Sequence, residues 1–301
     1  MSTVKRHPIG VELARELGTE HAADLGHAFD FTKRERVDSL PHGLEARLHM
    51  TRRLAGYLSV TAPDSPELPR VVRLASQVAT AIFVLADATP GTEQEVSFGT
   101  TRRVRLPATG FARPPDLSTW MAAFHLACVT RDREALDRLC RVPIPLLRKP
   151  PGRGGDSLAL AVDVLQRLWR GDQDTAAKLL DAVKAADPSQ VEGDGALVLG
   201  ILVAELELIY RLMLQDGEAF TQMLVTALER HRAYWSEGDR ARDPHGYIAW
   251  GRSPWPPSPS TSGSPSASTP AISPHGSSKA SARRRRASDA ASGDRRPSAE
   301  R

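Results

Sequence analysis

Catalytic chemistry requires particular residue types at particular spacings, and this 301-residue sequence contains few of them. It has no P-loop, no GxGxxG, no HExxH and no GxSxG. Its nine histidines are scattered, and none has metal-ligand spacing to another histidine, a cysteine or a carboxylate. We therefore expect no catalytic residue, no cofactor and no metal, and we predict that the protein is not an enzyme.

Glu205 is a charged residue in an unusual position on its helix. The apolar residues of 197–214 predict a helix on which Glu207 and Arg211 share a polar stripe and can pair at i,i+4. Glu205 lies off that stripe beside Ile209, where burial raises a carboxyl pKa unless a cation or N–H donors reach it. Two interpretations stay open: a polar contact to a neighbouring helix, or a site residue at the floor of a groove.

The two cysteines, Cys128 and Cys140, are a second candidate for chemistry. They lie in predicted helices without a CxxC pair or nearby histidines, so a zinc site is not favoured. We interpret both as small buried apolar residues in a reducing compartment.

The elements that would position a site are indicated by a ten-residue pattern that occurs at 131–140, 171–180 and 215–224. Each copy has Asp at its second position, an acidic residue at its fourth, and apolar residues at its sixth, ninth and tenth. The aspartates are Asp132, Asp172 and Asp216. Their offsets, 172 − 132 = 40 and 216 − 172 = 44, are typical of stacked helix-hairpin repeats. Because a carboxylate accepts the free N–H groups of a first helical turn, we predict that the three aspartates are N-caps.

Other segments complete the predicted fold. Helices are expected over 9–29, 43–61 and 67–88, the first with Gly18 as a point where it could break. Alternating apolar residues predict one small β-hairpin near 94–106. We interpret five aromatic residues as core or helix-junction residues: Trp120, Trp169, Tyr210, Tyr234 and Trp235. The fold class is therefore all-α, with stacked helix hairpins forming an α-solenoid-like array or an irregular bundle in a single domain over 1–251.

Three arginines, Arg102, Arg103 and Arg105, lie on the predicted hairpin. One interpretation is a solvated edge that discourages strand pairing. The other is a contact surface for an acidic partner.

The composition changes at Gly251. Residues 252–301 contain 14 Ser and 8 Pro but no Leu, Val, Phe or Tyr, so we expect a disordered tail. The tail carries nine basic and three acidic residues, a charge of +6, which leaves 4 − 6 = −2 for residues 1–251. The folded part is therefore not expected to bind nucleic acid. Weak contact with nucleic acid is expected only through Arg283, Arg284, Arg285 and Arg286.

Several stretches resemble the immunity protein 49 family of bacterial polymorphic toxin systems. They are Trp120–Pro143, Ile209–Phe220 with Leu228–Trp235, Val104–Gly110 and Asp243-Pro-His-Gly246. The resemblance covers roughly residues 70–251. It implies an α-helical protein that binds and neutralises a cognate toxin, and it transfers no catalytic residue.

The tail departs from that family, which continues beyond this point with apolar helical sequence. A reading-frame error is one explanation, because Ser253–Ser258 read two bases later with GC-rich codons can give Pro-Leu-Ala-Ala-Leu. The gene sequence tests this hypothesis.

The function that we expect is stoichiometric inhibition of a toxin in the cytoplasm. Residues 1–8 lack the apolar stretch of a signal peptide, and the charges in 197–214 make it a poor membrane span. One alternative is a nucleic-acid-associated or regulatory protein that acts through the basic tail. Another is an unrecognised helical enzyme with Glu205 in its site.

Overall fold

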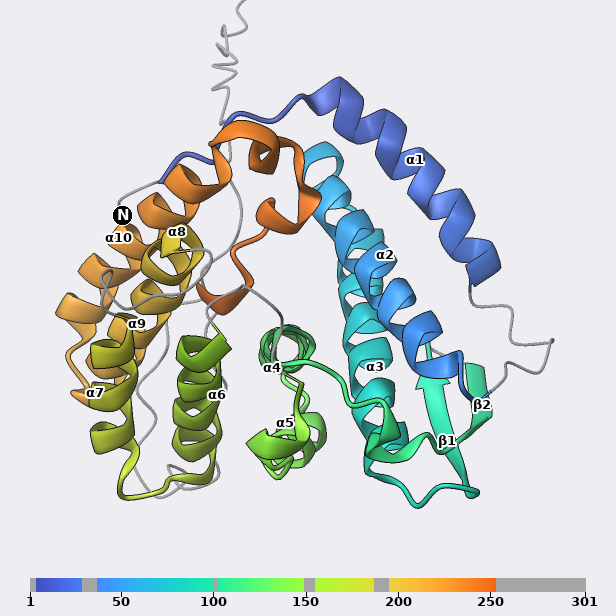
Figure 1. Cartoon of the computed structure of the whole chain (residues 1–301). Coiled ribbons are helices and arrows are strands. Elements are labelled where there is room, and N and C mark those ends of the chain that lie inside the picture. Colours follow the sequence, from blue (N-terminus) through green and yellow to red (C-terminus); the bar gives the residue numbers. More distant parts are fainter. Residues whose placement is uncertain (1–3, 29–36, 100–101, 149–154, 187–194, 253–301) are drawn as a thin grey trace, which may run out of the picture.

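A computed structural model describes residues 4–28, 37–99, 102–148, 155–186 and 195–252. Within these residues the helices follow one another around an arch, with the N-terminal helices in one arm and the C-terminal helices in the other (Figure 1). The predicted fold class is confirmed for the described chain, where the one sheet is a two-stranded antiparallel hairpin. The sequence predicts a tail that begins at residue 252, but Arg252 is buried in a 3-10 turn; the rest of the predicted tail, 253–301, lies outside the described residues.

Three helices form the first arm: α1 (Val11–Ala28), α2 (Leu40–Thr61) and α3 (Glu67–Asp87). The helix α2 packs between α1 and α3. The helix α1 runs unbroken through Gly18, where the sequence had suggested a break. A Cβ atom at Gly18 would lie 3.1 Å from Cβ of Tyr57 on α2, so this glycine permits the close approach of two helices.

The predicted hairpin consists of β1 (Glu93–Phe98) and β2 (Arg102–Pro107), with Val96 opposite Val104. Its apolar face packs on α3, which supplies the burial that an isolated hairpin lacks. Gln77 of α3 fixes the turn, because its amide donates to the Gly99 carbonyl at 3.0 Å and accepts the Gly99 N–H at 2.7 Å.

Three helix pairs follow the hairpin and contain the three copies of the ten-residue pattern. They are α4 (Leu117–Thr130) with α5 (Arg133–Leu139), α6 (Gly155–Arg170) with α7 (Thr175–Ala185), and α9 (Val203–Met213) with α10 (Gly217–Trp235). The members of each pair pack on one another.

The segment 197–214 is not the single regular helix that its periodicity predicts. It contains the end of α8 (Gly195–Leu197), a π-helical turn (Val198–Leu202) and then α9. The N–H of Val203 donates to the carbonyl of Val198, which is the five-residue spacing of a π-helix.

The three pattern copies share a feature of the backbone at their first position. Arg131, Gly171 and Gln215 all have positive φ, at 56°, 75° and 55°, and Arg131 and Gln215 are the non-glycine residues with positive φ in the described chain. A left-handed residue ends each preceding helix and lets the chain turn into the next one. Only glycine adopts this conformation without a steric cost to its side chain.

Gln215→Gly is expected to stabilise the protein by about 1 kcal/mol, because Gln215 is exposed and its left-handed conformation suits glycine. Urea unfolding would measure the change. Gln222→Gly, in the interior of α10, is the matched control and is expected to cost about 1 kcal/mol. Equal destabilisation at both positions would contradict the prediction.

The centre of the arch is α4, which is buried on most of its circumference. The rings of Trp120 and Phe124 stack at 5.1 Å, and the Trp120 indole N–H donates to the Leu139 carbonyl at 2.9 Å.

Among the described helices, α3 is long and apolar enough to cross a membrane by length and composition. Its apolar residues, however, pack into the main core, as in the core helix of a soluble protein.

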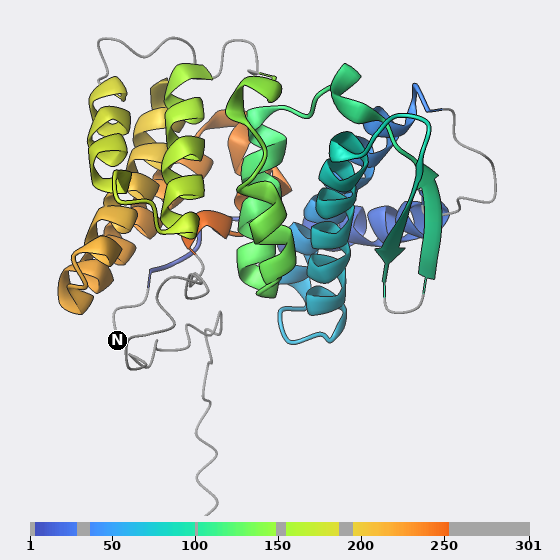
Figure 2. The same cartoon turned by 90° about the horizontal axis from the view of Figure 1, so that it is seen from below.

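After α10 the chain returns to the top of the arch through three 3-10 turns: η4 (Gly238–Arg242), η5 (Pro244–Gly246) and η6 (Trp250–Arg252). We call residues 238–252 the closing segment. Its turns contact α2, α4 and α10, and thus join elements of both arms (Figures 1 and 2). Shorter turns, η1 (Gly110–Ala112) and η2 (Ile144–Leu146), flank the α4–α5 pair.

Candidate functional site

The closing segment is held between the two arms by glycines that leave no room for a side chain. A Cβ atom at Gly56 of α2 would lie 2.3 Å from the Pro244 carbonyl oxygen. A Cβ atom at Gly246 would lie 2.2 Å from Cδ2 of Trp235 on α10. The sequence Asp243-Pro-His-Gly246 is therefore clamped between α2 on one side and α10 on the other.

Glu205 lies at the inner end of this segment and is 2 % exposed. Its Oε1 is 2.6 Å from Nε2 of His125 on α4, so the first interpretation, a polar contact to a neighbouring helix, describes its position. Gly251 covers the pair, since a Cβ atom there would lie 2.9 Å from Oε2 of Glu205. The sequence did not indicate His125 as the partner, because 80 residues separate the two side chains.

Arg252 completes the polar cluster around Glu205. Its guanidinium donates to the Ile201 carbonyl, in the π-helical turn, at 2.9 Å. Burial lowers the pKa of Arg252, and the nearby charge of Glu205 opposes that effect. The carboxylate thus has a hydrogen-bonded imidazole and a nearby cation, which are the partners that a buried acid requires.

Two further histidines lie close to the closing segment. Burial lowers the pKa of His231 to about 3, helped by the positive charges of Arg252, His7 and Arg6. Burial also lowers the pKa of His7, helped by Arg6 and Arg232. His7 is 4 % exposed, and its ring lies 5.6 Å from that of Tyr247 in the closing segment.

The lowered pKa of His231 predicts a loss of stability in mild acid. Between pH 6.5 and about 3 the unfolded chain takes up a proton on this histidine and the folded chain does not. The free energy of unfolding should therefore fall by about 1 kcal/mol for each pH unit below 6.5. Urea unfolding of the protein and of His231→Gln from pH 7.5 to 4.5 measures it, and the variant should have the shallower slope. An unchanged slope would contradict the assignment to His231.

A second cluster joins the closing segment to α2. Oδ1 of Asp243 is 2.7 Å from Nδ1 of His245, and Nε2 of His245 is 3.3 Å from Nδ1 of His49. Burial raises the pKa of Asp243, but hydrogen bonds from His245 outweigh it and hold that pKa below its ordinary value. Burial lowers the pKa of Arg52, which lies on α2 like His49, to about 10. The sequence did not indicate that His49 and His245 would lie together, because 196 positions separate them.

Two of the three predicted caps lie where the sequence placed them. Asp132 and Asp216 are N-cap residues of α5 and α10, and their side chains accept the N–H groups of Ala135 at 3.0 Å and Ala219 at 2.9 Å. Both aspartates therefore cap the N-terminus of a helix, and no ligand function is required to explain them.

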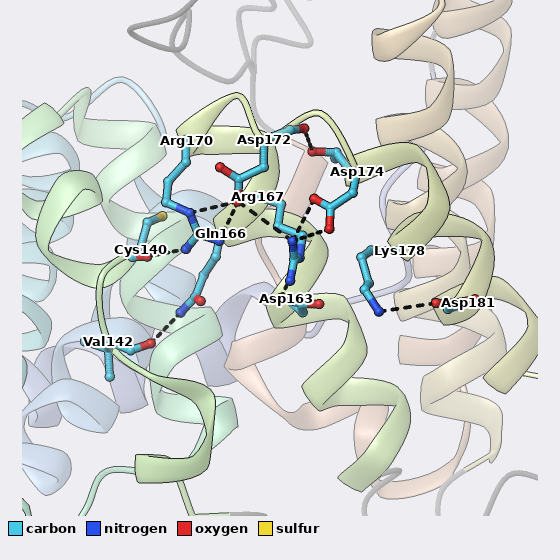
Figure 3. A network of polar contacts seen from close by, with 11 residues as sticks. Cys140, Val142, Asp163, Gln166, Arg167, Arg170, Asp172, Asp174, Lys178 and Asp181 are labelled. Carbon is cyan, nitrogen blue, oxygen red and sulfur yellow. Dashed lines mark hydrogen bonds and ion pairs between the residues drawn. The ribbon is translucent and has the colours of Figure 1, made fainter.

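The cap prediction is wrong for Asp172. The N-cap of α7 is Asp174, whose side chain makes no capping bond. Figure 3 shows Asp172 turned toward two arginines at the end of α6: its Oδ2 is 2.8 Å from Arg170 and 4.0 Å from Arg167. These arginines stand two and five positions before Asp172, where the first copy of the pattern has Thr130 and Ala127. Ion pairing therefore replaces capping in this copy.

The same network ties α6 to its neighbours. Arg167 also pairs with Asp163 and with Asp174, while Arg170 donates to the Cys140 carbonyl at 2.7 Å (Figure 3). Gln166 is buried and donates to the Val142 carbonyl at 2.9 Å. These contacts fix the α6–α7 turn against the end of α5.

Both cysteines are buried, and burial raises the pKa of each thiol, Cys128 and Cys140. A thiol with a raised pKa is a poor nucleophile at neutral pH.

On the hairpin, Arg103 and Arg105 are exposed, and Arg103 pairs with Glu95 at 3.1 Å. The side chain of Arg102 lies outside the described part of the chain.

The predicted surface of 197–214 also needs correction. Glu207 pairs with Arg230 of α10 at 2.7 Å, and not with Arg211, whose guanidinium lies over the ring of Tyr210. Tyr210 is 48 % exposed, although its aromatic character suggested a core position. Trp120, Trp169 and Tyr234 are buried, and Trp235 is half-buried.

These clusters can hold charges and protons in place, and in the described residues no group of three or more His, Cys, Asp or Glu side chains could bind a metal ion. The sequence model of the family described as immunity protein 49 matches residues 63–252, which is more than half of the chain. The chain belongs to the immunity protein 49 family. Neither curated proteins nor solved structures gave a match.

The immunity protein 49 match covers most of the arch. It begins just before α3 and ends at Arg252 in η6, so it includes the closing segment with Asp243-Pro-His-Gly246, His125 and Glu205. It leaves out residues 1–62, which include α1 and α2, so His7, His49 and Gly56 contact the closing segment from outside the matched range. The match ends next to the change in composition at Gly251.

Proposed function

We propose that this immunity protein 49 family member binds one cognate toxin in the cytoplasm of the producing cell and neutralises it without catalysis. The observation that carries the proposal is the family match over residues 63–252. Neutralisation would follow from covering the active or binding surface of the toxin in a one-to-one complex. Such complexes depend on a few buried anchor residues within a larger complementary surface.

Exposed apolar side chains on α7 and α9 are the first to test for toxin binding. Leu180 and Val183 on α7 are 54 % and 41 % exposed. Tyr210 and Leu214 near the end of α9 are also exposed, and α7 packs against α9. An exposed aromatic ring with an arginine over it, as in Tyr210 and Arg211, is a residue combination that is enriched among interface anchors.

The experiment requires the toxin, which we expect to be encoded beside this gene as the C-terminal module of a larger protein. Co-expression should restore growth of cells that produce the toxin module, and calorimetry should give a one-to-one complex. Tyr210→Ala should weaken binding about tenfold or more if Tyr210 lies in the interface. Val11→Ala, which trims an exposed apolar residue on α1, is the matched control and should leave binding unchanged. Absence of a complex with every neighbouring toxin module would contradict the proposal.

Two variants separate this function from the alternatives. A chain shortened after Arg252 should still neutralise the toxin, whereas binding through Arg283 to Arg286 should disappear with the tail and depend steeply on salt. Glu205→Gln removes the carboxylate charge that the enzyme alternative places in its site. Full neutralisation by a folded Glu205→Gln variant would argue against an enzymatic role for Glu205.

A further inference from the structure

The Asp243–His245–His49 chain brings two imidazole nitrogens together at the junction of α2 and η5. Nδ1 of His49 and Nε2 of His245 are 3.3 Å apart, and the planes of the two rings are inclined by 75°. Two nitrogen ligands at about 2.05 Å from a tetrahedral zinc ion are separated by about 3.3 Å. The separation of the two imidazole nitrogens thus matches that of two ligands on one ion.

The hydrogen bond between Asp243 and His245 sets the direction of the second ring. Because a carboxylate oxygen accepts, Nδ1 of His245 carries the hydrogen at this 2.7 Å contact, and Nε2 presents its lone pair toward His49. A histidine ligand oriented by a carboxylate on its other nitrogen is the common arrangement around protein-bound zinc. Asp243 is itself fixed, since it also accepts the backbone N–H of His245 at 3.0 Å.

We propose that His49 and His245 bind one divalent transition-metal ion, such as Zn²⁺, with water in the other positions. Imidazole nitrogens favour Zn²⁺, Cu²⁺, Ni²⁺ and Co²⁺ over Mg²⁺ and Ca²⁺. A bound ion would cross-link α2 to the closing segment and replace a histidine–histidine contact with two metal–nitrogen bonds.

The surroundings of the pair are compatible with a cation. His49 is exposed, so an ion can reach it from solvent. The carboxylates of Asp116 and Asp243 act electrostatically on His49, against the positive charge of Arg52.

The test is a zinc titration of the full chain without an affinity tag at pH 7.5, after removal of metal with a chelator. We expect one equivalent of Zn²⁺ to bind, and the thermal unfolding midpoint to rise when it is added. His49→Ala should weaken zinc binding at least tenfold and abolish the rise in midpoint. Asp243→Asn, which alters only the orienting carboxylate, should weaken binding about 10- to 100-fold.

Two controls make the outcome decisive. His42→Ala removes another exposed imidazole from α2, away from the pair, and should leave the zinc affinity unchanged. Circular dichroism would verify that each variant is folded. No saturable binding of Zn²⁺ by the wild-type chain, or equal binding by folded His49→Ala, would overturn the proposal and leave a histidine–histidine hydrogen bond.

Discussion

A Gly56→Ala variant is expected to be destabilised by about 2 kcal/mol, although alanine is the better helix former. Helix propensity alone would stabilise the variant by about 1 kcal/mol, since Gly56 lies in the interior of α2. The added Cβ atom would lie 2.3 Å from the carbonyl oxygen of Pro244, however, and 3.0 Å from its carbonyl carbon. These are backbone atoms of the closing segment and cannot rotate away, so we expect an overpacking cost of about 3 kcal/mol to prevail.

Urea unfolding would measure this loss, and Gly217→Ala provides the matched control. Gly217 begins α10, has nothing within 4 Å of an added Cβ atom, and should gain a few tenths of a kcal/mol up to about 1 kcal/mol as alanine. Gly246→Ala, on the other side of the same segment, should be destabilised like Gly56→Ala because its Cβ atom would overlap the Trp235 ring. A Gly56→Ala variant that is as stable as Gly217→Ala would show that the closing segment is not clamped against α2.

His125→Ala is expected to cost about 3 kcal/mol, the largest effect of a single substitution proposed for this chain. It would leave the buried Glu205 carboxylate without the imidazole that lies 2.6 Å away. Removal of one member of a buried pair costs about 3–5 kcal/mol when the remaining charge has no other partner. The nearby charge of Arg252 would compensate part of that cost, which places the expected loss at the lower end of the range.

A double-mutant cycle would separate the pair from the packing around it. The cycle consists of His125→Leu, Glu205→Leu and the double variant, which removes both polar groups and should therefore be more stable than His125→Leu alone. Thermal and urea unfolding of the three variants gives the coupling free energy between the two side chains. A coupling near zero would mean that His125 does not stabilise the Glu205 carboxylate.

Local sequence signals predicted the elements of this fold well. The helical periodicity of 43–61 and 67–88 and the alternation around Val96 and Val104 depend on neighbours within a few positions, and the structure has α2, α3 and the hairpin there. The first position of the ten-residue pattern shows how far such signals reach. Gly171 could be read as a left-handed helix end, whereas Arg131 and Gln215 adopt the same conformation without any signal in their side chains.

The contacts between distant segments were not predictable from one sequence. Glu205 was correctly singled out because an apolar helix face cannot leave a carboxylate unsatisfied. Nothing local indicated that His125 would reach it, or that His49 and His245 would meet. Asp172 shows the opposite case, in which a good local signal for a cap lost to the ion pairs of Arg167 and Arg170.

The position of the closing segment has a consequence for the synthesis of the protein. His245 meets His49 across 196 positions of sequence, so the closing segment cannot pack on α2 until the ribosome has made nearly all of the described chain. At about 5–20 residues per second, α2 waits roughly 10–40 s for its partner. During that interval the nascent chain exposes the apolar surface that the closing segment later covers. We expect chaperones to bind this surface at that stage.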